Sequence, residues 1–599
     1  MPIGGFSSNR PGLPRPLGAE SIATTSLWRR GRVPVRTAHR AGRRVHIIGL
    51  CGAGDQELQT LADRPVPTRA AWQWPGAYAV VEEWEHGLVL HTDPVAALPL
   101  YAVPWQGTWA WSTSARYLGA LARSRVDVTR LACAVLAPSL PVLVSGRTFF
   151  AGVEQLPPGS RVELPAAGGN YTCSTTWRPD PVDGPPHLRL RYALTGAVRL
   201  RARADPALSS DLSGGLDSTT VAVLASRAVP DPVNAVTVHP RGILDGADLR
   251  YARLAVAASH GRIRHHLVPL GDEHRPYTGL TGVPVTDEPA PSTLTQARLL
   301  AQLRWMRRSL GTRTHLTGDG GDSILFQPPA HLADLLRHHR YIRAGREALG
   351  WARLRRTAVA PLLRAAATTS RTTRRQARVA LARELTSRAP RSRGDVEWFA
   401  TLPVPEWADP AAVRLLTEAA ARYGAAPESL PGLDASVRVL VDEIREVART
   451  AAADAELADG CGIELHNPFL DGSVVDAVLR TPLDLRPPLH AYKPVLTLAF
   501  ADALPTELAA RTTKGSFEAD HYNGMRAALP DLLHTGGTNL ATLGLIDEKR
   551  FQDHMRRAAA GVPLPLAHIE QAVAVNAWLH ALAHTPGPAW VSPVPGRAV

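Results

Sequence analysis

Cysteine is scarce in this 599-residue chain, and so are long apolar runs. The cysteines form no C-x-x-C pair, which argues against a zinc site and against a disulfide framework; they are Cys51, Cys133, Cys173 and Cys461. The longest apolar stretch, Leu131 to Val144, contains prolines and is shorter than the roughly 20 residues of a membrane-spanning helix. No signal peptide is visible at the N-terminus, so we expect a protein of the reducing cytoplasm.

Lysine is also rare. Of the 67 lysine and arginine residues, only Lys493, Lys514 and Lys549 are lysines. Arginine therefore carries nearly all of the positive charge behind the net charge of +13, and a lysine at a motif position is informative. No compact nucleic-acid motif with interleaved aromatics appears in the arginine-rich region 335–395, so we expect no nucleic-acid partner. This region is predicted to be a helical insertion that covers a site, docks a partner protein or presents solvated faces.

A glycine-rich stretch, Leu212 to Thr219 (LSGGLDST), marks the first candidate site. It separates a short predicted strand from a predicted helix that runs to Arg227, so backbone N–H groups at the helix N-terminus can bind an anion. The G-x-x-x-x-G-K-[ST] pattern is absent, which disfavours transfer of a terminal phosphoryl group. The stretch instead predicts an ATP pyrophosphatase loop (PP-loop), in which the ATP-binding residues are Leu212, Ser213, Gly214, Gly215, Leu216, Asp217 and Ser218.

A second glycine-rich loop, Thr317 to Asp322 (TGDGGD), follows another short predicted strand. Its Thr317 and Gly318 are predicted to contact ATP or pyrophosphate. Between the two loops, strands and helices alternate as in a parallel sheet, with strands at 233–239 and 262–269 and helices at 247–259 and 293–309. Both loops would meet at the carboxyl edge of that sheet, where Asp217 and Asp322 can hold a magnesium ion.

Five motifs, in this order, resemble the synthetase domain of the asparagine synthetase superfamily over most of residues 188–520. They are SGGLDS, Thr286-Asp287-Glu288-Pro289, TGDGGD, Asn467-Pro468-Phe469-Leu470-Asp471 and Arg511-Thr512-Thr513-Lys514. Members of that superfamily adenylate a carboxylate with ATP and let a nitrogen nucleophile displace AMP. The resemblance therefore implies an AMP-forming, amide-forming ligase with ATP and Mg²⁺ as cofactors.

The resemblance also suggests catalytic residues. Lys514 matches a lysine that contacts phosphate and the developing oxyanion, although a solvated surface position is the alternative; Lys493 suits a surface or packing role equally well. Asp319 stands where asparagine synthetases carry glutamate and β-lactam synthetases carry tyrosine, so it can orient or deprotonate the attacking amine or simply cap its loop. Glu464, shortly before the NPFLD motif, is a second candidate base.

Residues 1–165 resemble a class II glutamine amidotransferase domain, through short alternating strings such as Trp74–Val80 and Trp111–Ser114. Glutamine hydrolysis in that family needs a cysteine directly after the initiator methionine, but this chain has Pro2, so its amine must come from elsewhere. Proline- and glycine-rich residues 166–186 predict a linker to a synthetase domain at 187–599. The predicted fold class is α/β: a degenerate amidotransferase-like α+β sandwich, then a PP-loop ATP pyrophosphatase domain with a parallel sheet and helical additions.

Among superfamily members that lack this cysteine, the opening Met1–Ser7 and the segment from Tyr492 to Phe517 look most like lasso peptide cyclases. That resemblance implies adenylation of an Asp or Glu side chain of a leaderless core peptide. An isopeptide (macrolactam) bond then forms with the peptide's own N-terminal amine, and a leader-binding protein and a leader peptidase are candidate partners. Two alternatives stay open: a small-molecule amide or β-lactam-type synthetase, and an inactive scaffold or RNA-binding protein with this fold.

Overall fold

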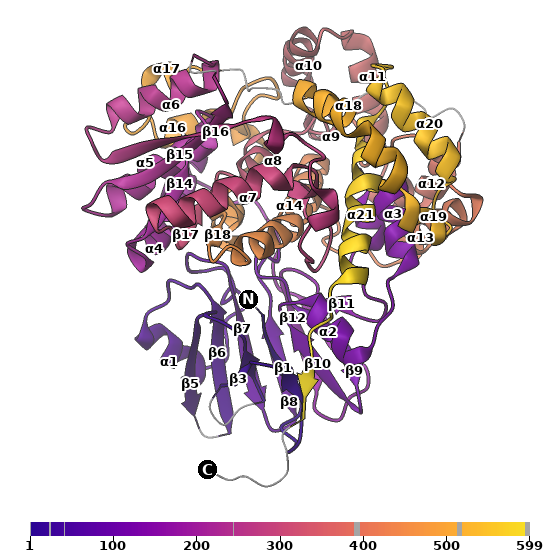
Figure 1. Cartoon of the computed structure of the whole chain (residues 1–599). Coiled ribbons are helices and arrows are strands. Elements are labelled where there is room, and N and C mark those ends of the chain that lie inside the picture. Colours follow the sequence, from indigo (N-terminus) through magenta and orange to yellow (C-terminus); the bar gives the residue numbers. More distant parts are fainter. Residues whose placement is uncertain are drawn as a thin grey trace.

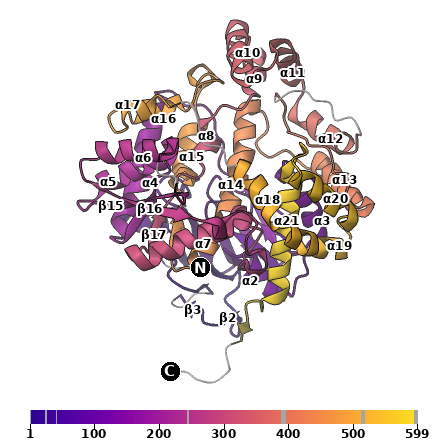
Figure 2. The same ribbon diagram turned by 45° about the horizontal axis from the view of Figure 1, so that its top comes forward.

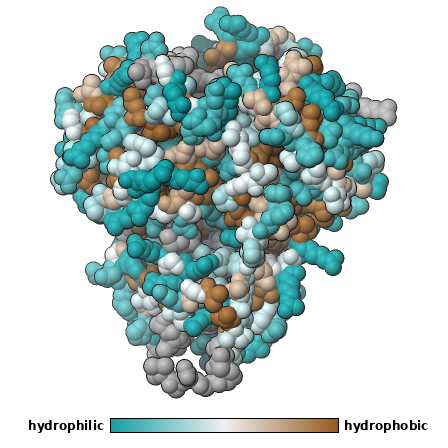
Figure 3. Space-filling view, in the orientation of Figure 1, coloured by the Kyte–Doolittle hydropathy of each residue, from teal (hydrophilic) through white to brown (hydrophobic). Residues whose placement is uncertain are grey.

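The computed structural model describes residues 2–22, 26–40, 42–242, 245–387, 396–511 and 518–592. In the view of Figure 1, a β-sandwich lies below a larger part that contains a parallel sheet and many helices. These layers confirm the predicted α/β class. Within the described residues, no helix has the length and apolar character needed to cross a membrane. Hydrophilic residues cover most of the face seen in Figure 3, with apolar residues scattered among them.

Two six-stranded antiparallel sheets form the sandwich. The first has the order β11-β9-β10-β1-β4-β3 and the second β13-β12-β8-β7-β6-β5. Their bounds are β1 (Ile3–Phe6), β3 (Glu20–Ser21), β4 (Trp28–Arg29), β5 (Val35–Arg40), β6 (Arg43–Gly49), β7 (Tyr78–Trp84), β8 (Gly87–His91), β9 (Tyr101–Trp105), β10 (Thr108–Ser112), β11 (Glu154–Gln155), β12 (Ser160–Pro165) and β13 (Thr172–Thr175). The facing sides meet in a core that joins Ile48 and Leu90 of one sheet to Trp111 of the other. Because β13 pairs with β12, part of the predicted linker 166–186 belongs to the sandwich.

Five parallel strands form the central sheet of the larger part, in the order β16-β15-β14-β17-β18. Their bounds are β14 (Leu208–Asp211), β15 (Val233–Pro240), β16 (Ile263–Leu270), β17 (Thr314–Leu316) and β18 (Glu464–His466). Successive residues of β15 face opposite ways, as a sheet covered on both faces requires. Ala235 packs against α5 (Leu216–Ala228) and α6 (Ala247–Ala258), whereas Val236 packs towards α7 (Gln296–Trp305) and α14 (Ala435–Asp459). The predicted alternation of strands and helices is therefore confirmed.

Of the remaining helices, α1 and α2 pack on the strands of the sandwich, and the others belong to the larger part of the molecule. The bounds of these helices are α1 (Asp55–Asp63), α2 (Ala115–Ala122), α3 (Val128–Leu136), α4 (Pro186–Ala204), α8 (Gly321–Leu325), α9 (His331–Arg337), α10 (Tyr341–Arg355), α11 (Val359–Arg371), α12 (Arg374–Leu385), α13 (Pro410–Ala425), α15 (Gly472–Leu479), α16 (Pro494–Ala499), α17 (Thr506–Ala509), α18 (Glu518–Thr535), α19 (Thr538–Thr542), α20 (Glu548–Ala559) and α21 (Leu566–His584). The arginine-rich region is helical as far as it is described, and α9, α10 and α11 lie at the top of the molecule in both ribbon views (Figure 1 and Figure 2).

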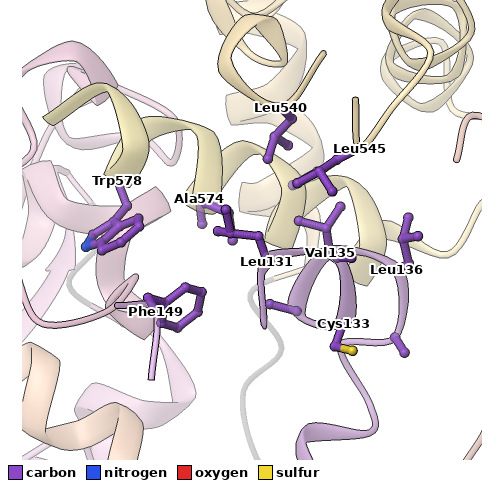
Figure 4. Packing of buried hydrophobic residues seen from close by; sticks show 14 of the residues in the cluster. Leu131, Cys133, Val135, Leu136, Phe149, Leu540, Leu545, Ala574 and Trp578 are labelled. Carbon is purple, nitrogen blue, oxygen red and sulfur yellow. The ribbon is translucent and has the colours of Figure 1, made fainter. Parts of the chain in front are cut away.

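Helix α3 packs among the C-terminal helices, although it follows the strands of the sandwich in sequence. Leu131 of α3 shares one apolar cluster with Leu540 and Leu545 (Figure 4). In the same cluster the rings of Phe149 and Trp578 lie 5.2 Å apart, measured between centroids. At the far end of the chain, β19 (Trp590–Val591) pairs with β2 (Arg15–Pro16). The N-terminal and C-terminal parts of the chain therefore share a core.

Two motif residues join the sandwich to the synthetase part. The carboxylate of Asp471 accepts two hydrogen bonds from the Arg201 guanidinium, at 2.5 and 2.8 Å, and one from the backbone N–H of Gly76, at 2.8 Å. Asp287 accepts a hydrogen bond from Ser114 Oγ, at 2.6 Å, and from two backbone N–H groups at the start of α2. Burial raises the pKa of Asp287, while these donors favour its charged form. The structure thus gives both motifs a part in domain contact.

Candidate active site

The PP-loop follows β14 and turns directly into α5. Gly214 has a φ of +81°, and an added Cβ would lie 2.0 Å from the carbonyl oxygen of Asp248, so the position requires glycine. The hydroxyls of Ser213 and Ser218 lie 2.8 Å apart. No side chain among the described residues caps α5, so its first N–H groups can receive an anion such as phosphate. The other predicted loop residues, Leu212, Gly215 and Leu216, form the turn around these hydroxyls. The side chains of Leu212 and Leu216 are buried.

The second glycine-rich loop packs against the first with almost no space between them. An added Cβ on Gly318 would lie 2.6 Å from the backbone nitrogen of Ser218. On Gly321 it would lie 2.5 Å from the carboxyl carbon of Asp217. These glycines therefore allow two loops about a hundred residues apart in sequence to place their aspartates side by side.

Asp217, Asp322 and Lys493 form a charged cluster where the two loops meet. The Lys493 ammonium donates to both carboxylates, at 2.5 Å to Asp322 Oδ1. The lysine side chain is 1% exposed, compared with 14% for Asp217 and 42% for Asp322. Burial lowers the pKa of Lys493, but the two carboxylates outweigh that effect and raise it overall. Its φ of +48° is uncommon for a residue other than glycine.

This pair of carboxylates also suits a magnesium ion. Magnesium prefers oxygen ligands and is commonly held by one or two carboxylates together with substrate phosphates and water. Among the described residues, no group of three or more His, Cys, Asp or Glu side chains could hold a metal ion. Two carboxylates could hold Mg²⁺ only together with other oxygen ligands, such as phosphate oxygens and water.

A cavity of about 1,000 Å³, called the loop cavity here, opens over the carboxyl ends of β14, β15 and β16. Its lining includes Ser213 of the PP-loop, Val236 of β15 and the side chains of Asp248 and Arg511. The buried Arg511 guanidinium donates to the carbonyl oxygen of Gly214, at 2.8 Å, and pairs with Asp248, at 2.5 Å. Arg511 thus ties the PP-loop to the start of α6.

A larger cavity of about 1,320 Å³, called the apolar cavity here, begins at Asp322 and extends between α10 and α14. Four aromatic side chains contribute to its walls: Phe326, Trp351, Trp398 and Tyr492. The residues that line the apolar cavity differ from those that line the loop cavity. The two cavities are therefore distinct, and the charged cluster contributes Asp322 to the wall of the apolar cavity.

Residues 189–580 match the asparagine synthase family. The chain belongs to this family. The match covers more than half of the chain and includes both glycine-rich loops and Lys493. Membership indicates an ATP-dependent ligase that forms amide bonds. No curated protein matches the chain in a direct sequence comparison.

Two carboxyl groups that sequence reasoning missed lie near the loop aspartates of this asparagine synthase family member. Burial raises the pKa of Asp454 to about 7, and the nearby carboxylate of Asp319 adds to that rise. Burial also raises the pKa of Glu443, which lines the apolar cavity beside Asp322. Both missed residues lie on α14, whose helical pattern resembles that of any amphipathic helix. Only their position across from the loops distinguishes them.

The predicted catalytic residues are not all brought together. Asp319 is exposed, and its backbone N–H donates to Thr317 Oγ1, which itself donates to Asn467. Glu464 lies at the amino end of β18, away from the loops, where a hydrogen bond from His466 lowers its pKa. Lys514 lies outside the described residues. The structure therefore places Asp319 at the carboxyl edge and Glu464 at the opposite edge of the sheet.

Proposed function

We propose that this protein is an ATP-dependent lasso peptide cyclase. It would adenylate an Asp or Glu side chain of a leaderless core peptide and join it to the N-terminal amine of the same peptide, releasing pyrophosphate and AMP. Pro2 stands where glutamine hydrolysis would need a cysteine, so the nitrogen has to come from the substrate. A leader peptidase, assisted by a leader-binding protein, would expose that amine beforehand.

In the first step, a carboxylate oxygen of the peptide attacks the α-phosphorus of ATP, and the bond to pyrophosphate breaks. Ser213, Ser218 and the N-terminus of α5 would orient the phosphates. When bound at Asp217 and Asp322, Mg²⁺ would offset the negative charge of the leaving group. The Lys493 ammonium pairs with the same two carboxylates, so the ion would compete with it for their oxygens.

In the second step, the amine nitrogen attacks the acyl carbon, the bond to AMP breaks, and the ammonium proton passes to a base. Asp319, which lies at the carboxyl edge, is the base we favour, and Asp454 lies behind it. The pKa of Asp454, raised to about 7 by burial and by the Asp319 carboxylate, suits an acceptor of that proton near neutral pH. Lys514 would contact the oxyanion of this step. Glu464 receives no role, because it lies at the other edge of the sheet.

The size of the apolar cavity is the observation that carries the proposal. Pockets for small ligands usually measure roughly 300–1,000 Å³. The apolar cavity, at about 1,320 Å³, exceeds that range and is separate from the loop cavity, which has the phosphate-binding features. A folded peptide needs such room, whereas an amino-acid-sized substrate does not. Holding amine and acyl group in line can contribute roughly 7–11 kcal/mol to such a closure.

The test is mass spectrometry of the purified protein after incubation with ATP, Mg²⁺ and a leaderless core peptide encoded by a neighbouring short reading frame. A carboxypeptidase challenge of the product follows. Loss of one water from the peptide, release of AMP and a protease-resistant tail are the expected results.

Each of the other outcomes contradicts the proposal in its own way. Release of AMP without dehydration of the peptide would favour a small-molecule amide or β-lactam-type synthetase. No AMP and no dehydrated peptide, with the leader-binding protein and peptidase also present, would favour a scaffold or RNA-binding role.

A further inference from the structure

We infer that the apolar cavity selects the substrate, and that α10 is the wall that makes it specific for peptides with large apolar side chains next to the activated carboxyl. This inference rests on the proposed function, because it treats the cavity as the peptide site. It goes further by naming the element that discriminates between peptides and the kind of side chain that it favours.

The aromatic wall of the cavity reaches the charged cluster directly. The rings of Phe326 and Tyr492 lie 5.4 Å apart between centroids, with an edge-to-face orientation. The Lys493 ammonium lies 5.2 Å from the first ring centroid and 5.5 Å from the second. A peptide whose carboxyl group lies at this cluster would therefore place its neighbouring side chains against aromatic surface.

Helix α10 is attached to the same segment that carries Tyr492 and Lys493. The buried carboxylate of Glu347 accepts a hydrogen bond from the backbone N–H of Leu489, at 3.0 Å. One turn later, an added Cβ on Gly350 would lie 2.4 Å from the ring of His490, so helix and segment are in close contact. The α10 wall therefore has a defined position relative to the reacting groups.

The C-terminal turn of α10 forms the mouth of the cavity. Leu354 lines the cavity and is 60% exposed, so a peptide that enters the cavity can contact this side chain. Beside it, the Arg355 guanidinium lies 4.8 Å from the centroid of the Trp351 ring, which also lines the cavity. This combination offers apolar and aromatic surface to a peptide with aromatic or branched apolar side chains.

The experiment compares two substitutions on this one helix. Leu354→Glu places a carboxylate at the mouth, whereas Leu349→Glu places it on an exposed part of α10 that does not line the cavity. Both leucines are exposed, at 60% and 41%, so both variants should fold. Fluorescence anisotropy of the labelled core peptide and separate titrations with ATP measure the two binding events.

We expect Leu354→Glu to weaken peptide binding by about tenfold or more and to leave ATP binding unchanged, and Leu349→Glu to change either by less than about twofold. A second peptide carries serine in place of the apolar residues beside its acceptor acid. This change should weaken binding of the peptide to the wild type, and should weaken its binding to Leu354→Glu far less. Equal effects of the two glutamate variants, or no binding of the peptide to the wild type, would overturn the inference.

Failure of the proposed function would look different. In that case the peptide would still bind in a manner that depends on Leu354, but it would not be dehydrated. Conversely, the wild type and Leu354→Glu could both dehydrate the peptide and bind it with equal affinity. That result would preserve the function and overturn only the role of α10.

Discussion

Replacing Lys493 with alanine would leave the carboxylates of Asp217 and Asp322 next to each other without their shared cation. Removing one partner of a buried ion pair usually costs about 3–5 kcal/mol. Because the Asp322 side chain is 42% exposed and its charge is partly screened, we expect a loss of about 3 kcal/mol in the free energy of unfolding without magnesium.

Magnesium should restore most of this loss, because a divalent cation can take the place of the ammonium between the two carboxylates. A ligand present at a hundredfold excess over its Kd stabilises the folded state by about 2.7 kcal/mol. Wild-type protein should gain less, since there Lys493 competes with the ion for the same oxygens. The assay is a urea titration with EDTA and with increasing Mg²⁺, and Lys549→Ala, at an exposed lysine, is the control.

A loss of less than about 1 kcal/mol without magnesium would contradict the assigned pairing of Lys493. An equal gain from Mg²⁺ in wild type, Lys493→Ala and Lys549→Ala would contradict the assignment of Asp217 and Asp322 as the metal site.

Four further predictions concern the candidate site and the domain contact, and the last of them rests on the sequence alone. Asp322→Asn should abolish Mg²⁺-dependent release of AMP while the protein stays folded, so AMP release at the wild-type rate would contradict its role as a ligand. Asp471→Ala should lower stability by about 3–5 kcal/mol in urea titrations, because it leaves the buried Arg201 guanidinium unpaired. A change below about 1 kcal/mol would contradict the assigned ion pair. Because the pKa of Asp454 is raised, the folded state binds more protons than the unfolded state between about pH 4 and pH 7. The free energy of unfolding should therefore fall as pH rises through this window. Turnover should rise over the same window, with a midpoint near pH 7. Asp454→Asn should remove both pH effects, and an unchanged pH–rate profile would exclude it from proton transfer. Lys514→Ala should lower kcat far more than it weakens ATP binding, as measured by kcat and by the KM for ATP; weaker binding with unchanged kcat would indicate phosphate anchoring alone.

Local sequence was sufficient for the parts of the molecule that depend on backbone geometry. Gly214 occupies a positive φ against the carbonyl of Asp248, so glycine was required there and the loop could be recognised. The strands at 233–239 and 262–269 were predictable because short segments rich in residues of high β-propensity alternate with helical segments along the chain. Two aspartates at the ends of such strands then had to share one edge of the sheet.

Residues from distant segments were beyond such reasoning. Lys493 looked equally suited to the surface or to packing, yet it is buried between two aspartates that lie 276 and 171 residues away in sequence. Glu464 stood close to a catalytic motif in sequence but lies at the wrong end of its strand, because β18 is only three residues long and the motif follows its other end.

The sequence by itself therefore determined the two loops, the parallel sheet and the likeness to amide-forming ligases, because turns, helix starts and strand alternation depend on neighbours in the chain. Only the tertiary structure decided which charges meet. It brought Lys493 between the aspartates and set α3 among the C-terminal helices. Apolar periodicity reveals which face of an element is buried, but the partner of that face depends on how the whole chain packs.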